Sequence, residues 1–307
     1  KVQKQLSQLT YMAGRGNFSS RLGFIAAVAG SAVGLGNIWQ FPYMTGANGG
    51  AIFLIIYVLW IFLIGLPLMV GEIAIGRNTR NNAHGAYLKF GGKKWAFVGL
   101  FGIICGVMIL SFYNVVAGWA FGYFLQIGFG DLLEVQDFEG YFSNYISNVG
   151  SIYIYSLGFM IITGFIVMRG IQGGIEKASK ILMPALFVIL IGFILYWLTL
   201  PNAMAGVEFY LVPDFSKFSG KAIYDALGQA FFSLSLGMGA LITFGSYIQK
   251  NDNLVTSATL VSITDTMVAF LAGFMIFPLV YSMNASPTEG PGLVFVVLAG
   301  AFHSMCP

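Results

Sequence analysis

The longest uncharged stretch of the chain runs from Leu22 to Gly71. As a single helix it would be about 75 Å long, more than twice the thickness of a hydrocarbon core of about 30 Å. The stretch must therefore cross a membrane twice. The composition agrees, since 57% of the residues are hydrophobic, only 9% are charged and the mean hydropathy is +0.81. Such values are far from those of a soluble domain.

Apolar runs separated by turn-forming clusters divide the chain into seven predicted spans. Transmembrane barrel strands would be about half as long as these runs, so helices are the only spanning structure that fits. The sequence therefore predicts an all-α integral membrane fold. The expected spans cover about 22–46, 51–75, 95–128, 150–168, 179–200, 222–247 and 254–284.

Basic residues give the expected orientation. Thirteen of the fifteen Lys and Arg residues fall in the segments 1–21, 76–94, 169–180 and 248–253, which share one side of the membrane. This bias predicts a cytoplasmic amino terminus in a multi-pass protein of the plasma (inner) membrane. We expect residues 1–21 to form a cytoplasmic arm, 22–284 the transmembrane domain, and 285–307 an extracellular loop at which the chain ends.

The sequence offers little for catalysis. Cys105, Cys306, His84 and His303 stand apart from one another, and no nucleophile lies beside a base. Because catalysis needs a positioned cluster, we predict that the protein is not an enzyme. The net charge of +3 does not suggest a nucleic-acid partner. The basic side is interpreted as a topology signal, with contact to anionic lipid as the alternative.

Two spans carry helix-breaking residues at matching positions. The first has Gly30, Gly34 and Gly36 followed by Asn37; the other, in 222–247, has serines and glycines over 233–239. Small residues also allow close helix packing, which is the alternative interpretation. A pair of broken helices nevertheless points to a midplane transport site, where freed carbonyls and amides can hold an ion or a zwitterion.

Two acidic residues lie inside apolar spans. Asp265 is expected near the membrane midplane, where a carboxylate is costly and needs a partner. That partner is either a bound cation or, if Asp265 is protonated, a hydrogen bond to a neighbouring helix. Glu72 lies near the inner end of the second span. We expect it to form hydrogen bonds with backbone groups that a broken helix leaves free.

These motifs resemble the neurotransmitter:sodium symporter family, whose members include bacterial amino-acid transporters. The resemblance runs along essentially the whole chain. It implies a sodium-coupled amino-acid symporter with two inverted five-helix repeats, of which this chain holds spans one to five and then six and seven. The chain would stop before helix eight. The motifs, in family order, are R-G-N-F-S-S-R-L-G-F (15–24), A-G-S-A-V-G-L-G-N-I-W-Q-F-P-Y (29–43), N-G-G (48–50), P-L-M-V-G-E (67–72) and F-F-S-L-S-L-G-M-G (231–239).

The resemblance also implies two sodium sites. The first would use the Ala32 carbonyl, the Asn37 side chain, the Ser233 hydroxyl and carbonyl, and Asp265. The second would use the carbonyls of Gly30 and Val33, with its remaining ligands on a helix beyond this chain. Sodium would be co-transported with the substrate.

The implied substrate site lies beside the first sodium ion. The carboxylate of the bound amino acid would accept hydrogen bonds from the Leu35 and Gly36 amides and from the Tyr113 hydroxyl. Since Gly34 and Gly36 leave the floor open and Met238 is an adaptable pocket residue, we expect a large apolar or aromatic amino acid. The full expected set is Ala32, Gly34, Leu35, Gly36, Ile109, Tyr113, Phe232, Ser233, Ser235 and Met238.

Gating and chloride dependence follow from departures from the family pattern. Gln40 stands where an outer-gate Arg is expected, and Phe18 replaces an inner-gate Trp. The expected gating residues are Arg15, Phe18, Gln40, Ser246 and Tyr247. Asp265 supplies a negative charge near the positions that hold chloride in dependent members, equivalent to Tyr57, Gln229, Ser233 and Ala269. We therefore expect that chloride is not required.

Other classes remain as alternatives. A heptahelical receptor also has seven spans, but its amino terminus lies outside, opposite to the basic bias. A more serious alternative is a non-transporting fragment or accessory membrane protein of the same family. The sequence predicts neither the particular amino acid, nor the sodium stoichiometry, nor the oligomeric state.

Overall fold

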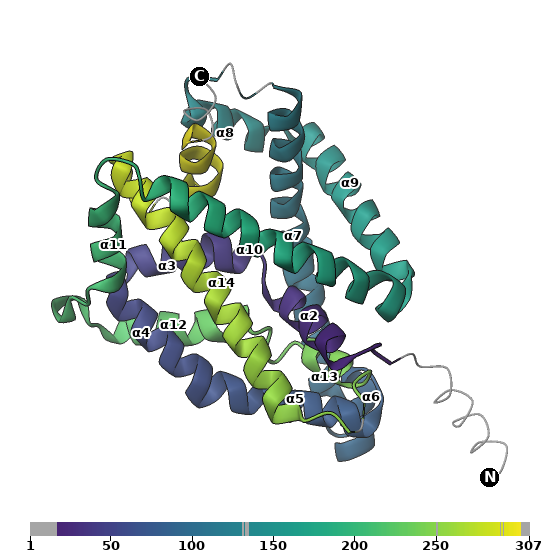
Figure 1. Cartoon of the computed structure of the whole chain (residues 1–307). Helices are drawn as coiled ribbons and strands as arrows, with labels where there is room; N and C mark the ends of the chain where they lie inside the picture. The colour runs from purple at the N-terminus through teal and green to yellow at the C-terminus, as the bar shows by residue number, and fades with distance from the viewer. Residues whose placement is uncertain are drawn as a thin grey trace, which may run out of the picture.

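The computed structural model of the chain describes residues 17–130, 132, 135–249, 251–288, 290 and 292–301. Its regular structure, within those residues, is entirely helical, as predicted (Figure 1). The first half consists of α2 (Arg21–Ala32), η1 (Gly36–Gln40), α3 (Phe41–Ala47), α4 (Ala51–Trp60), η2 (Ile61–Gly65), α5 (Leu66–Thr79), α6 (Ala83–Gly91), α7 (Ala96–Phe129) and α8 (Phe138–Ser147).

The second half of the chain begins with the helix that follows α8. It consists of α9 (Val149–Met168), η4 (Ile171–Glu176), α10 (Lys177–Trp197), α11 (Ala203–Leu211), η5 (Phe215–Lys217), α12 (Gly220–Ser233), α13 (Ala240–Gly245), α14 (Leu254–Ser282) and η6 (Leu293–Leu298). Here η5 is a 3-10 turn, whereas η1, η2, η4 and η6 are π-helical.

Helix starts follow from short polar side chains placed just before apolar segments. Ser20, Asn82, Asn148, Ser219 and Asn253 each accept a hydrogen bond from the backbone N–H three residues later, at 2.9 to 3.1 Å. Each therefore satisfies one of the amides that a helix start leaves without an intrahelical partner.

The spans agree with the sequence in place but differ at their ends. Among the residues that the structure describes, five helical stretches are long and apolar enough to cross a membrane: 51–79, 96–129, 149–168, 171–197 and 254–282. The fifth predicted span begins at Ile171 rather than near residue 179, because η4 continues directly into α10. The pair Arg21–Ala32 and Gly36–Ala47 makes a further span, bent by 54°.

The expected span 222–247 is broken, as its serines and glycines predicted. It is divided into α12 and α13, with Leu234–Gly239 between them. Three short helices, α6, α8 and α11, occupy segments that were expected to be loops. The segment after residue 284 also differs, because η6 is helical there and Phe295 packs among Trp119, Tyr123 and Phe142.

The helix α14 lies centrally and organises the packing. It contacts α2, α5, α10 and α11 and also η1, and in Figure 1 it crosses the middle of the molecule. Its buried residues extend over most of its length. One large core joins α2, α4, α5, α12 and α14. This arrangement brings the middle of α14 against both broken helices.

Candidate substrate and ion site between two broken helices

The first break separates α2 from η1. Backbone bonding of α2 ends at Val33, which is extended (φ −71°, ψ 122°), and η1 starts at Gly36. Two amides freed by this break have side-chain partners: Asn37 Oδ1 accepts from Gly34 N at 3.0 Å, and the Tyr113 hydroxyl accepts from Gly36 N at 2.7 Å. Local polar side chains thus replace the missing helical bonds.

The second break is longer and has a different backbone. Ser235, Gly237 and Gly239 have φ values of 55°, 79° and 76°, in the left-handed region that suits glycine. Glu72 Oε1 accepts from the freed Gly237 N at 2.7 Å, which confirms the expected role of that carboxylate. At the far end of the break, the Thr243 hydroxyl donates to the Gly239 carbonyl at 2.9 Å.

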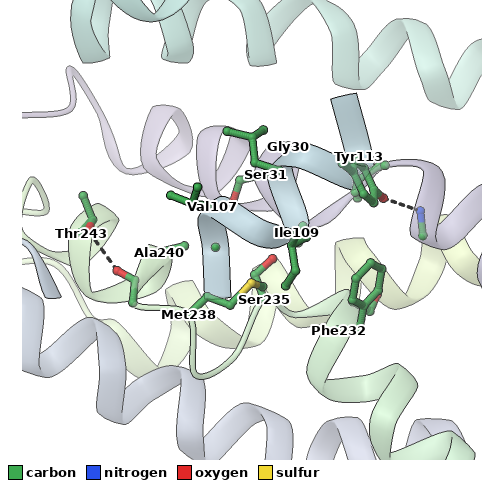
Figure 2. A pocket seen from close by; sticks show the side chains of 18 of the residues that line it. Gly30, Ser31, Val107, Ile109, Tyr113, Phe232, Ser235, Met238, Ala240 and Thr243 are labelled. Carbon is green, nitrogen blue, oxygen red and sulfur yellow. Dashed lines mark hydrogen bonds between the residues drawn. The ribbon is translucent and has the colours of Figure 1, made fainter. Parts of the chain in front are cut away.

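A cavity of about 590 Å³ lies between the two breaks and α7 (Figure 2). Its lining comes from three parts of the chain: the first break, one face of α7, and the second break with the start of α13. These residues are Gly30, Ser31, Ala32, Val33, Gly34, Gly36, Ile103, Gly106, Val107, Ile109, Leu110, Tyr113, Phe232, Ser233, Ser235, Met238, Gly239, Ala240 and Thr243.

The structure brings together nearly all of the residues predicted to bind substrate. Nine of the ten line this cavity, and Leu35 does not. Its side chain instead packs against a neighbouring buried cluster that includes Val116 and Phe295. The prediction for Leu35 concerned its backbone amide. The side chain of the same residue has a separate role in packing.

Sequence reasoning missed the extent of the α7 face. Ile103, Gly106 and Leu110 line the cavity as well as Tyr113. These positions are three or four residues apart and so fall on one side of a helix. Extending the helical spacing backwards from Tyr113 would have identified them.

Glycine at position 36 is required by close approach. A Cβ there would lie 2.9 Å from a ring carbon of Phe232 and 3.4 Å from the Tyr113 hydroxyl. The rings of Phe232 and Tyr113 lie near one end of the cavity lining, tilted by 48° to each other with centroids 6.2 Å apart (Figure 2). Together these three residues fix the width of the cavity at one end.

Asp265 forms the buried polar centre beside the cavity. Its carboxylate accepts from Asn37 Nδ2 at 2.8 Å and from the Ser233 hydroxyl at 2.7 Å. Asn37 and Asp265 are fully buried, as is Tyr57, whose hydroxyl donates to Ser233 Oγ at 3.2 Å. The groups that contact the carboxylate are neutral donors, which can replace water around an ionised Asp but cannot neutralise its charge.

The structure also places the positions that the resemblance associates with chloride. Gln229 is buried and its Nε2 donates to the Gly36 carbonyl at 3.4 Å. Its Oε1 has no hydrogen-bond partner among the described residues. Ala269 is fully buried one helical turn after Asp265. Ser233 links the carboxylate to the Tyr57 hydroxyl, whereas Gln229 contacts the first break at Gly36.

Gly30 and Val33, predicted for the second sodium site, also line the cavity. A Cβ on Gly30 would lie 3.0 Å from Ser179 Oγ of α10. The small residue thus allows α2 to approach α10 closely. The two carbonyls predicted to be ligands belong to the last turn of α2 and to the extended residue that follows it.

The predicted gating residues fall into two places. Arg15 lies outside the described residues. Gln40 is the last residue of η1, the helix that follows the first break. Phe18 is buried against Phe24, Phe244 and Tyr247, and its amide donates to the Tyr247 carbonyl at 3.3 Å.

Sequence reasoning missed two side chains that hold the segment around Phe18. Arg80 donates to Asn17 Oδ1 at 2.9 Å and to the carbonyl of Ser246 at 3.0 Å. On the other flank, buried Glu176 accepts from the Ser19 amide at 3.0 Å and pairs with Lys180 at 2.6 Å. Their positions in the sequence, at the ends of apolar spans, gave no sign of these long-range contacts.

Comparison with known proteins agrees with this arrangement. The sequence profile of the sodium:neurotransmitter symporter family matches residues 15–133 and 132–307. The chain therefore belongs to that family, whose members are multi-pass membrane transporters rather than enzymes. The structure of MhsT in complex with L-phenylalanine superimposes with a TM-score of 0.90 at 47% identity, over 95% of this chain and 67% of that chain.

Curated relatives are also transporters. The sodium-dependent transporter YhdH of Bacillus subtilis is 42% identical over 291 residues, which are 94% of this chain and 64% of YhdH. The sodium-dependent serotonin transporter of Drosophila melanogaster is 29% identical, over 95% of this chain and 54% of its own length. The chain thus spans 64% of the length of YhdH, and a sodium-dependent transporter of Haemophilus influenzae is covered to a similar 66%.

Proposed function

We propose that this chain forms the binding region of a sodium-coupled symporter for large apolar or aromatic amino acids. The observation that carries the proposal is the cavity between the two broken helices, which adjoins the buried centre of Asp265, Asn37 and Ser233. Such a site exposed in turn to the two sides of the membrane would operate by alternating access.

Sodium would bind at this polar centre as a co-transported substrate. Sodium is a hard cation and prefers oxygen ligands, which are available from the Asp265 carboxylate, the Asn37 amide, Ser233 and the Ala32 carbonyl. Ser233 and Ala32 also line the cavity. An ion there would neutralise Asp265 and would lie within reach of a substrate carboxylate, so that binding of the two would be coupled.

The preference for a large side chain rests on the lining. Ile109, Leu110, Phe232 and Met238 offer apolar surface, and a volume of about 590 Å³ is within the range of small-molecule sites. MhsT, which is similar in structure, was crystallised with L-phenylalanine. A small polar amino acid would leave most of this apolar surface without contacts.

The test is equilibrium binding of labelled leucine, tyrosine, tryptophan and phenylalanine to the purified chain, in sodium and in potassium. We expect binding that requires sodium and is lost in Asp265→Ala. Asp214→Ala is the matched control, because Asp214 is an exposed carboxylate outside the spans. Glycine or alanine displacing the label better than leucine would contradict the proposed specificity.

A folded chain that binds no amino acid at any sodium concentration would contradict binding by this chain alone. That result favours the alternative, a non-transporting part or partner of a transporter. Circular dichroism and size exclusion of the same preparation establish whether the chain is folded. Transport itself requires a flux assay in liposomes, and is proposed only for a protein that contains this chain.

Chloride and orientation are two finer parts of the proposal. Because Asp265 already places a negative charge beside Tyr57 and Ser233, replacing chloride with gluconate should leave sodium-dependent binding unchanged. A cysteine introduced near Lys1 should be labelled from the cytoplasmic side of the plasma membrane. Loss of binding in gluconate, or labelling from outside, would refute these two parts separately.

A further inference from the structure

The segment that connects the second and third spans has an unusual surface. Every residue from Leu88 to Trp95, at the end of α6 and in the turn before α7, is exposed. Three of these eight residues are lysines, Lys89, Lys93 and Lys94, and the sequence has no acidic residue between Glu72 and Asp131. Phe90 and Trp95, which stand among the lysines, are 62% and 57% exposed.

The opposite side of α6 is anchored to the protein. Ala83 and Ala86 are buried with Ile242 of α13 in one apolar cluster. His84 Nδ1 lies 3.1 Å from the Ala96 carbonyl, which fixes α6 against the start of α7. The helix is therefore held by one face and presents its lysines and aromatic rings on a surface of fixed position.

The exposed segment lies where the lipid-facing surface begins. In the first turns of α7, Phe97, Leu100, Phe101 and Ile104 are all exposed and apolar. Such a surface belongs in hydrocarbon, so the residues just before it lie at the level of the lipid headgroups. Exposed Trp and Lys side chains at this level are typical of a membrane interface.

Among the described residues, no acidic side chain forms an ion pair with the lysines of this segment. In the part of the chain that the structure describes, the ion pairs are Lys180 with Glu176, Lys217 with Asp214 and Lys221 with Asp225. Lys89 donates only to a backbone carbonyl, that of Thr79 at 3.3 Å.

From this juxtaposition we propose that Lys89, Lys93 and Lys94, together with Phe90 and Trp95, form a binding site for the headgroup of an anionic phospholipid. The ammonium groups would bind the phosphodiester, and the two rings would lie against the glycerol and upper acyl chains. The positive charge is compact, fixed in place and at headgroup depth, which favours an anionic lipid over a zwitterionic one.

Trp95 provides a local probe for the experiment. The whole chain is reconstituted into phosphatidylcholine nanodiscs that contain a minor fraction of phosphatidylglycerol, with bromine on the upper acyl chains of one lipid or the other. Subtracting the fluorescence of Trp95→Phe isolates the quenching of this residue from that of the other four tryptophans. Per mole of brominated lipid, we expect phosphatidylglycerol to quench Trp95 at least about fivefold more strongly than phosphatidylcholine. Fivefold is the factor in binding that one lysine near an anionic surface contributes.

The combined variant Lys89→Gln, Lys93→Gln and Lys94→Gln should abolish this preference. The matched control Lys177→Gln, Lys217→Gln and Lys221→Gln removes the same charge away from α6 and should keep it. Equal quenching by the two lipids in the unmodified chain would overturn the proposal. A preference that survives the α6 variant would also overturn it, because the lysines would then not be the site.

Discussion

Both broken helices leave backbone amides without helical hydrogen-bond partners, and the two breaks satisfy these amides in different ways. In the first, the break is short and its freed amides are taken by polar side chains, Asn37 Oδ1 and the Tyr113 hydroxyl. In the second, six residues intervene between α12 and α13, and three of them adopt left-handed backbone conformations. Helical bonds are replaced there mainly by the turn itself, with Glu72 holding one amide.

The two breaks also differ in how tightly the surrounding residues pack against them. Asn37 is fully buried and joins the first break to α14 through Asp265, whereas Gly237 in the second is exposed and has no neighbouring atom within 4 Å of an added Cβ. The first break is therefore built into a packed polar centre. The second is determined mostly by its own backbone preferences, so we expect equivalent changes to cost more in the first.

The largest effect is expected from Asn37→Ala. This change removes the acceptor for the half-buried Gly34 amide and a donor to the fully buried Asp265 carboxylate, and leaves both groups without these partners. Bonds to charged groups and unsatisfied buried groups each contribute about 1 to 3 kcal/mol, so the free energy of unfolding should fall by roughly 3 kcal/mol or more. The measurement is SDS titration in mixed micelles, without sodium.

Asn48→Ala is the control for that change. Asn48 is also buried, but it ends α3 outside the break and its side chain donates to one carbonyl, that of Met44 at 3.0 Å. Its loss should cost about 1 kcal/mol. If both variants lost the same stability, the polar centre would contribute nothing special to the first break and the contrast would fail.

An intermediate effect is expected at Glu72, which is the side-chain support of the second break. Glu72→Ala leaves the Gly237 amide without its acceptor and should lower the free energy of unfolding by about 1 to 3 kcal/mol. Glu72→Gln keeps an oxygen that can accept from the same amide.

The glutamine variant should therefore recover most of the lost stability in the same SDS titration. Recovery would show that the hydrogen bond, rather than the charge, supports the break. If Glu72→Gln were as unstable as Glu72→Ala, the negative charge itself would be needed, and the second break would depend on a charge, unlike the first.

Both breaks could be predicted from the sequence, because clusters of glycine and serine inside apolar runs disfavour a continuous helix. The family resemblance identified the residues around the cavity, nine of which line it. What the sequence did not show was the backbone path of the second break. Ser235, Gly237 and Gly239 adopt left-handed conformations there. The sequence also did not show which amide Glu72 would hold, because Gly237 is far from Glu72 along the chain.

The same limit explains the other differences. The helical segment η6 is stabilised by Phe295 packing against Trp119 and Phe142, contacts that no local pattern encodes. The helices α6 and α11 are too short to be predicted as spans, and α6 is held by its contact with Ile242. Local rules located the site, whereas its supports come from tertiary packing.

The smallest effect is expected from Gly237→Ala, which isolates the backbone contribution to the second break. With no atom within 4 Å of the new Cβ and φ at 79°, the cost is that of a left-handed L-residue, about 1 to 2 kcal/mol. Gly71→Ala is the matched control, since it also has open space around the Cβ but lies inside helix α5. There the change should stabilise by about 0.5 to 1 kcal/mol. Opposite signs in the SDS titration would establish that the backbone conformation determines the second break, whereas a neutral Gly237→Ala would mean that the segment readily adopts another conformation.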